Sequence, residues 1–217
     1  MSTGLLAVGF DFNKAHHDEF HDWYDLEHLP ERQAVAGFGA CERWLALEQA
    51  TSAFATYDLD DISVLRSAGY GAIAYDNLSP WSKRVTAMCT RLLRFEGLQL
   101  SPGSAAAPSG AGALLINAMN VVAGGEDEFN AWYDEEHLPA LRSVAGTLSA
   151  RRYKADANGK STHQYLAMYH LRDAQVVSSA PWSEAVDTPW SARMRPLFRD
   201  RLRVLNTRYD RATSRLA

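Results

Sequence analysis

Cysteine and long apolar runs are both scarce in this sequence. Its two cysteines, Cys41 and Cys89, lack the CxxC spacing of a zinc site and the density of a disulfide framework. No apolar run approaches the roughly 20 residues that span a bilayer. The amino-terminal segment lacks the basic start of a signal peptide. We therefore expect a cytoplasmic protein with no membrane partner.

Strong net charge and nucleotide-binding motifs are missing as well. A net charge of -4 and a pI near 6.0 argue against a nucleic-acid partner. No GxSxG elbow, Walker loop or dinucleotide fingerprint follows a predicted strand. Nucleophilic hydrolysis and nucleotide-dependent chemistry are therefore disfavoured, and cofactor-independent proton transfer is the chemistry that remains.

The sequence does contain an internal repeat. The segment Glu19–Pro30, EFHDWYDLEHLP, returns as EFNAWYDEEHLP at Glu128–Pro139, with nine of twelve positions identical and an offset of 109 residues. The same offset relates the Val-Ala-Gly that ends at Gly37 to the one that ends at Gly146. This period is too long for a solenoid and predicts two copies of one small unit.

A stretch rich in Pro, Gly, Ser and Ala lies between the copies and reads SPGSAAAPSGAG. Such a composition is typical of a linker. We therefore predict a first unit over residues 1–98, a linker over 99–112 and a second unit over 113–217.

Each copy has the pattern strand, helix, strand, strand, helix, strand. The predicted first strands are 5–12 and 113–122, the third strands 53–59 and 164–171, and the last strands 91–95 and 201–205. The second helical regions, 62–88 and 174–197, are broken by Pro80 and Pro189. This order predicts an α+β fold, in which each unit is an antiparallel four-stranded sheet with both helices on one face.

Each sheet would leave one apolar face uncovered, and two tandem copies can stack these faces into a barrel. Here the sequence resembles the dimeric α+β barrel superfamily, and the motif WYDxEHLP with its following Val-Ala-Gly resembles the EthD-like branch. The resemblance implies two ferredoxin-like units fused in tandem as an intramolecular pseudo-dimer, with further homodimerisation left open. The wider superfamily includes cyclases, isomerases, dehydratases and monooxygenases of hydrophobic small molecules.

The motif helix presents a carboxylate among aromatic residues. At about 100° per residue, Phe20, Trp23, Tyr24 and Glu27 share one face, as do their counterparts around Glu136. A buried carboxylate acquires a raised pKa and becomes a candidate general acid or base. The alternative is that both glutamates tether neighbouring backbone or pair with Arg43 and Arg152. Both interpretations predict burial.

A histidine follows each glutamate. Because Pro30 and Pro139 disfavour helical geometry at the preceding leucine, His28 and His137 should lie near a helix end, where the dipole favours imidazolium. The resemblance implies that a histidine here lines a pocket. The alternative is a structural hydrogen bond to the loop.

Aromatic residues that recur in both copies are the other pocket candidates, although such a set is also typical of a core. They are Trp23, Tyr24, Tyr57, Trp81, Trp132, Tyr133, Tyr169 and Trp190. Tyr57 and Tyr169 could donate a proton to an oxyanion if they face the barrel interior. Asn117 aligns with Val8, which suggests that only one half retains a working pocket.

We predict no metal site and no cofactor. His17, His21 and His28 share a helical face, but the second copy keeps only the last histidine, so a solvated face is the favoured interpretation. Haem, which some superfamily members bind, has no distinctive axial ligand here. The arginine-rich stretch from Arg193 to Arg215 is interpreted as an exposed face, from which one arginine could pair with an acidic substrate.

Three functions are compatible with these features. The first is an enzyme in which a His-Glu pair moves a proton next to a carbonyl of a hydrophobic or aromatic substrate, in a cyclisation, isomerisation or dehydration. The second is a ligand-binding barrel without catalysis. The third is a structural protein with a filled barrel, in which the motif holds the two halves together.

Overall fold

Eight antiparallel strands close into a barrel in the computed structural model, which describes residues 3–211. The strands are β1 (Gly4–Asp11), β2 (Phe38–Ala46), β3 (Ser52–Leu59), β4 (Thr90–Ser101), β5 (Ala113–Val121), β6 (Thr147–Ala155), β7 (Tyr165–Leu171) and β8 (Phe198–Arg208). The prediction of a mixed α+β fold with a closed barrel is therefore confirmed.

The helices are short and occupy the predicted segments. They are α1 (His17–Trp23), α2 (Leu29–Gln33), α3 (Ala68–Gly71), α4 (Pro80–Ala87), α5 (Glu126–Trp132), α6 (Leu138–Ser143), α7 (Ala180–Val186) and α8 (Pro189–Met194). Two π-helical turns, Tyr24–His28 and Tyr133–His137, join α1 to α2 and α5 to α6. The 3₁₀ turns are Ile62–Arg66, Tyr75–Asn77, Ala174–Ser178 and Arg195–Leu197.

Two of the predicted helix breaks begin helices instead. Pro80 and Pro189 occupy the first turns of α4 and α8, where a missing N–H removes no hydrogen bond. Ser79 and Thr188 precede them as N-caps, each accepting a hydrogen bond from a backbone N–H of the first turn.

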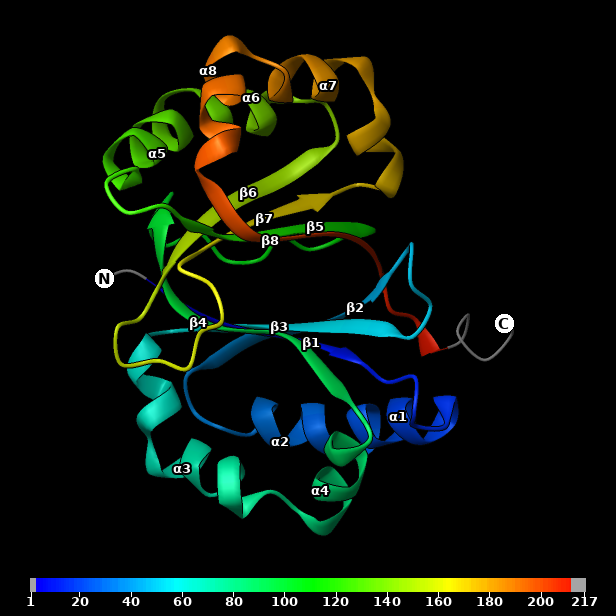
Figure 1. Ribbon diagram of the computed structural model, residues 1–217. Helices are drawn as coiled ribbons and strands as arrows, with labels where there is room; N and C mark the ends of the chain where they lie inside the picture. Colours follow the sequence, from blue (N-terminus) through cyan, green and yellow to red (C-terminus); the bar gives the residue numbers. More distant parts are fainter. Residues whose placement is uncertain (1–2, 212–217) are drawn as a thin grey trace.

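The strand order is the same in the two halves of the chain. The first half contributes β4-β1-β3-β2 and the second contributes β8-β5-β7-β6. The halves join where β2 pairs with β8 and where β4 pairs with β6. Figure 1 shows the two sheets face to face, with the helices of each half covering its outer side.

The space between the two sheets is filled by side chains. Apolar residues of both halves, among them Trp44, Phe95 and Tyr153, form one buried cluster there. Each sheet also packs against its own helices through one further cluster of buried residues. A filled barrel is what the third function, a structural protein, predicts. The space between each sheet and its own helices can still form a site.

Charged pairs cross between the halves as well. Asp58 of β3 accepts hydrogen bonds of 2.8 Å from the buried guanidinium of Arg151 on β6. Glu42 of β2 lies 3.3 Å from His170 of β7 and 3.0 Å from Arg208 of β8. The barrel interior therefore couples the halves by charge as well as by apolar packing.

The last strand of each half is longer than predicted, and β4 extends into the segment predicted as a linker. Beyond it the backbone N–H groups of Ala105 and Ala107 donate to Gln99 and Asp58. The connecting segment is thus held against the first half. Between residues 3 and 211, no helix has the length and apolar character needed to cross a bilayer.

Candidate functional site

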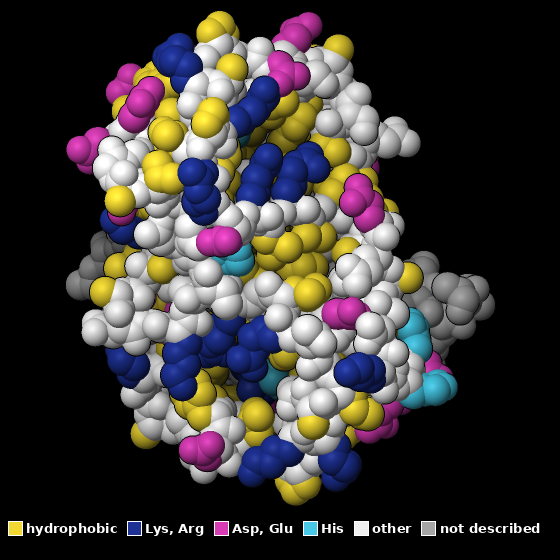
Figure 2. Space-filling view, viewed as in Figure 1, with side chains coloured by type: hydrophobic (Ala, Val, Ile, Leu, Met, Phe, Trp, Pro, Cys, Tyr) yellow, Lys and Arg dark blue, Asp and Glu magenta, His cyan; other side chains and the backbone are white. Residues whose placement is uncertain are grey.

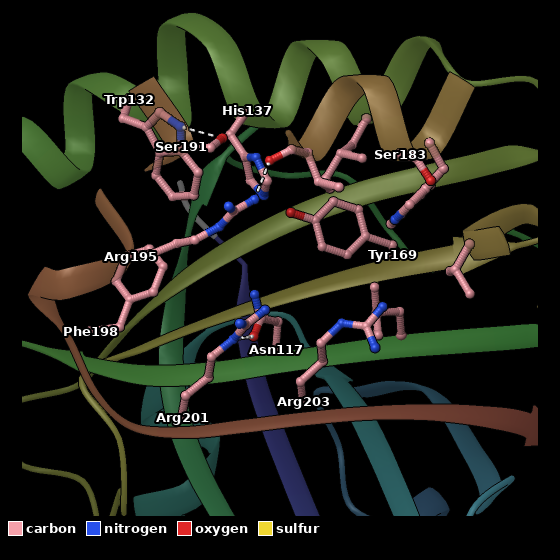
Figure 3. A pocket seen from close by; sticks show the side chains of 15 residues that line it. Asn117, Trp132, His137, Tyr169, Ser183, Ser191, Arg195, Phe198, Arg201 and Arg203 are labelled. Carbon is pink, nitrogen blue, oxygen red and sulfur yellow. Dashed lines mark hydrogen bonds between the residues drawn. The ribbon is translucent and has the colours of Figure 1, made fainter. Parts of the chain in front are cut away.

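Each half contains a cavity between its sheet and its helices. The cavity of the second half has a volume of about 220 Å³, and that of the first half about 160 Å³. Figure 2 shows Lys and Arg side chains gathered around a hollow in each half. The second-half cavity is lined by Leu115, Asn117, Trp132, His137, Leu141, Tyr169, Val177, Trp182, Ser183, Val186, Ser191, Arg195, Phe198, Arg201 and Arg203 (Figure 3).

The π-helical turn decides which motif residue reaches the cavity. The prediction that the glutamates share a face with the aromatic residues assumed 3.6 residues per turn. A π-helical turn is wider, so the histidine that follows each glutamate lies on the aromatic face instead. The ring of His137 stacks on Trp132 at 4.1 Å and meets Tyr133 edge-on at 5.1 Å. In the first half, His28 lies 4.3 Å from Trp23. The histidines therefore take the position predicted for the glutamates, and each lines the cavity of its half.

Both histidines are held neutral. Burial, followed by the charges of Arg201 and Arg195, lowers the pKa of His137 to about 3. Burial also places the pKa of His28 well below its usual range. Neither Nδ1 has a hydrogen-bond partner among the described residues. The predicted imidazolium at a helix end is wrong, because the helix continues through Leu29 and Leu138 and the surroundings are apolar and cationic.

Glu27 and Glu136 lie outside both cavities and are half-buried, contrary to the predicted burial. Glu136 accepts a hydrogen bond of 2.6 Å from Thr188, the N-cap of α8. Glu27 accepts bonds of 2.5 Å and 3.0 Å from Ser79 and Ser82. Each glutamate thus ties the motif helix to the start of a later helix, as the tether alternative held, but through hydroxyl groups.

The arginines proposed as partners of these glutamates have other partners. Arg43 pairs with Asp25 and contacts Nδ1 of His21 at 2.7 Å. Arg152 lies 3.4 Å from Asp134 and also donates to Asn130. The arginine pairing of Glu27 and Glu136 is therefore wrong.

Tyr169 and Tyr57 line the second and first cavities, and both face the helices instead of the barrel interior. Both hydroxyls are buried, that of Tyr169 next to the hydroxyl of Tyr133 and that of Tyr57 next to the hydroxyl of Tyr24. Burial and then the neighbouring Tyr133 raise the pKa of Tyr169 well above its usual value. Tyr169 therefore remains a neutral hydroxyl that can donate a hydrogen bond.

Most of the other aromatic candidates on the motif helices belong to the hydrophobic core. Trp23, Tyr24 and Tyr133 are fully buried, and only Trp132 of the motif tryptophans lines a cavity. Trp23 donates to Ser82 at 2.9 Å, and Trp132 donates to Ser191 at 3.3 Å.

The half-buried tryptophans of α4 and α8 lie outside both cavities. Trp81 donates to Glu19 at 2.7 Å. Over residues 3–211, Nε1 of Trp190 finds no acceptor.

Asn117 separates the two cavities chemically. Its side-chain oxygen accepts a hydrogen bond of 3.0 Å from Nε of Arg201 and so orients that guanidinium. Val8 occupies the corresponding place in the first half. Both halves form a cavity, and only the second has this amide.

Sequence reasoning did not place Arg195, Arg201 and Arg203 at the site. The sequence contained one indication of these residues, because all three lie in the arginine-rich stretch that starts at Arg193. What the sequence lacked was the bulge at Asp200, which has a φ of 50° and interrupts the β5–β8 pairing near Arg201. The end of that stretch, Arg215, lies outside the described residues.

In the described part of the chain, no group of three or more His, Cys, Asp or Glu residues could hold a metal ion. The predicted solvated face is wrong for His21, because its ring is buried and stacks on Tyr209 at 4.8 Å. His17 is exposed.

No protein-family model matches the chain, and no curated protein matches it. Solved structures do match. A mutant chlorite dismutase from Candidatus Nitrospira defluvii is 12% identical, with a TM-score of 0.65 over 99% of this chain and 94% of that chain. A haem-binding protein from Thermus thermophilus is 12% identical, with a TM-score of 0.62 over 99% and 94%.

An anthrone oxidase-like protein is 10% identical, with a TM-score of 0.62 over 95% of this chain and 92% of that chain. Likenesses at such low identity show the fold alone. They support an α+β barrel of the ferredoxin-like kind.

The second-half cavity does not fit haem. An axial histidine normally donates its other ring N–H to a partner that fixes the ring. Nδ1 of His137 has no such partner among the described residues, and the ring is packed against Trp132. The volume of about 220 Å³ also lies below the roughly 300–1,000 Å³ of pockets for drug-sized ligands.

Proposed function

We propose that the chain is a small-molecule-binding barrel of two fused ferredoxin-like units, of the EthD-like branch, whose second-half cavity performs cofactor-independent acid/base chemistry. The substrate is a hydrophobic carbonyl or aromatic compound. The repeated motif and the equal strand order of the halves support the tandem origin. One observation carries the activity: the neutral His137, with no partner for Nδ1 in residues 3–211, lines the same cavity as the neutral Tyr169.

In this proposal the imidazole of His137 accepts a proton from the carbon next to the substrate carbonyl. Tyr169 donates a hydrogen bond to the oxyanion that develops on that carbonyl. The resulting enolate is the common intermediate of isomerisation, cyclisation and dehydration. The negative charge formed near Arg201 and Arg195 offsets their effect on the pKa of His137, so the base gains strength as the proton moves.

The test is deuterium exchange at the acidic carbon of a panel of aryl ketones and aryl diketones, followed by NMR in D₂O. We expect His137→Gln to slow exchange by about 100-fold or more and Tyr169→Phe by about tenfold. His28→Gln, in the first-half cavity, is the matched control and should exchange like the native protein. Full exchange by His137→Gln would refute the proposed role of this histidine.

The second candidate function is ligand binding without catalysis. The apolar lining of the same cavity, formed by Trp132, Trp182 and Phe198, favours it. Tight binding of panel compounds with no exchange above the buffer rate would select this function over the enzyme.

A further inference from the structure

We propose that the ligand of the second-half cavity carries a carboxylate, which Arg201 and Arg203 bind, on a compact aromatic body. The inference rests on the proposed function in placing a small molecule in that cavity. It is independent of whether His137 transfers a proton.

The two arginines converge on the cavity from one strand. Residues two apart on a strand point to the same side, so Arg201 and Arg203 both leave β8 on its helix-facing side. Figure 3 shows their side chains extending toward His137 and Tyr169, with Asn117 beside Arg201. Two guanidinium groups that reach one cavity can both donate hydrogen bonds to a carboxylate there.

These charges have no carboxylate to neutralise them. Arg201 bonds only to the neutral amide of Asn117, and Arg203 has no hydrogen-bond or ion-pair partner in residues 3–211. Arg195, the third arginine of the lining, is paired with Asp187. No Asp or Glu is among the described residues that line the cavity.

The first half shows what the neutralised form of this site looks like. Arg94 lies on β4 opposite Val8 and corresponds to Arg203, which lies on β8 opposite Asn117. Arg94 pairs with Glu96, two residues further along its strand. The counterpart of Glu96 is Leu205, so Arg203 has lost the internal anion that Arg94 keeps.

Two further positions differ between the halves. Asn117 replaces Val8, and Arg201 replaces Leu92, which packs with the barrel cluster instead. The replacement of Glu96 by Leu205 therefore leaves Arg203 without the carboxylate that pairs with Arg94, whereas each cavity keeps one further arginine from its last strand, Arg91 in the first half and Arg201 in the second. An arginine released from its internal carboxylate in one half is what an anion site requires.

The other residues that line the cavity determine the size and aromatic character of the ligand. Trp132, Trp182 and Phe198 offer aromatic surface, and the volume is about 220 Å³. Because an apolar cavity of about 150 Å³ binds benzene, this volume accommodates a substituted ring and its carboxylate. A long acyl chain does not fit.

Calorimetric titration at low salt tests the inference with two pairs of probes: benzoate against benzamide, and 1-naphthoate against 1-naphthamide. We expect each carboxylate to bind at least tenfold more tightly than its amide. Arg201→Gln and Arg203→Gln should each weaken carboxylate binding by about tenfold, because a hydrogen bond to a charged group is lost, and leave amide binding unchanged. Retained amide binding also shows that each variant is folded.

Arg91→Gln is the matched control, since Arg91 lines the first-half cavity. This substitution removes the same charge from the molecule as the two β8 substitutions do. It should bind carboxylates like the native protein. Leu205→Glu is the reverse test, because it restores the internal anion of the first half and should weaken carboxylate binding without affecting the amides.

Each outcome decides something. Equal binding of carboxylates and amides overturns the anion preference and leaves the proposed small-molecule site standing. Loss of carboxylate binding in Arg91→Gln but not in the β8 variants places the anion in the first half and overturns the inference. Failure of all four probes to bind overturns both the inference and the proposed site.

Discussion

At the scale of single residues, His137 links the cavity to the stability of the protein. Its pKa is about 3 in the folded chain, against roughly 6.5 for an unfolded histidine. Between these values the unfolded state binds more protons, so the free energy of unfolding rises with pH. The contribution is complete above about pH 6.5 and is lost as the pH falls toward 3.

Replacing this histidine should therefore change the pH dependence of stability. Between pH 6 and pH 4 we expect the native protein to lose about 1.4 kcal/mol per pH unit more than His137→Gln, the slope for one proton. Urea unfolding at several pH values measures the difference. Parallel stability curves for the two proteins would contradict a neutral, buried His137.

Glu136 is the residue at which the catalytic and tethering interpretations separate. Because a glutamine oxygen can still accept the hydrogen bond from Thr188, Glu136→Gln should unfold within about 1 kcal/mol of the native protein. We expect its deuterium exchange to stay within about tenfold of the native rate. If Glu136→Gln is folded but its deuterium exchange rate falls by about 100-fold, this carboxylate takes part in proton transfer.

At the scale of elements, the π-helical turns explain why one helix serves two purposes. The extra residue in the turn puts His137 on the aromatic face and moves Glu136 to the edge, where it meets the N-cap of α8. Such turns are frequent at functional sites. The cavity histidine and the helix tether therefore come from neighbouring residues of one motif.

The cap of α8 gives a prediction at this scale. Thr188→Ala removes both the cap to the N–H of Ser191 and the hydroxyl that Glu136 needs. We expect it to lower the free energy of unfolding by about 2–3 kcal/mol. Thr188→Ser keeps both bonds and should cost less than about 0.5 kcal/mol. Chemical denaturation compares the two, and equal losses would argue against the cap.

At the scale of the whole molecule, buried charges join the halves. Arg151 is 1% exposed and its counter-ion, Asp58, comes from the other half. Asp58→Leu leaves that guanidinium uncompensated and should cost about 3–5 kcal/mol. The double variant Asp58→Leu, Arg151→Met removes both charges and should be more stable than the single variant. A double variant that shows the simple sum of the two single losses in urea unfolding would rule out this coupling.

Much of the architecture could be predicted from local patterns. Strand-length apolar runs and the repeated motif are patterns confined to short segments of the sequence, and they led to a mixed α+β barrel. Strand ends were less predictable: β4 and β8 run beyond 91–95 and 201–205, and pairing with the other half extends the carboxyl end of each strand.

Part of the site could be predicted and part could not. His137, Trp132, Tyr169 and Asn117 were candidates on sequence grounds, and the structure places them around one cavity. The burial of the glutamates was predicted wrongly, since a regular helix was assumed where a wider turn occurs. Arg201 and Arg203 could not be assigned, because nothing local links the end of the chain to a motif far earlier in it.

The sequence by itself determined the composition of each layer: which residues repeat, which segments become strands, and which side chains are apolar enough to be buried. Only the tertiary structure decided in which of two equivalent cavities Arg203 lacks the carboxylate that pairs with Arg94, and which of two neighbouring motif residues faces the cavity. The physical reason is that both outcomes depend on non-local partners. A guanidinium is neutralised or released by what lies beside it on the sheet, and a helix turn is widened by what its side chains pack against.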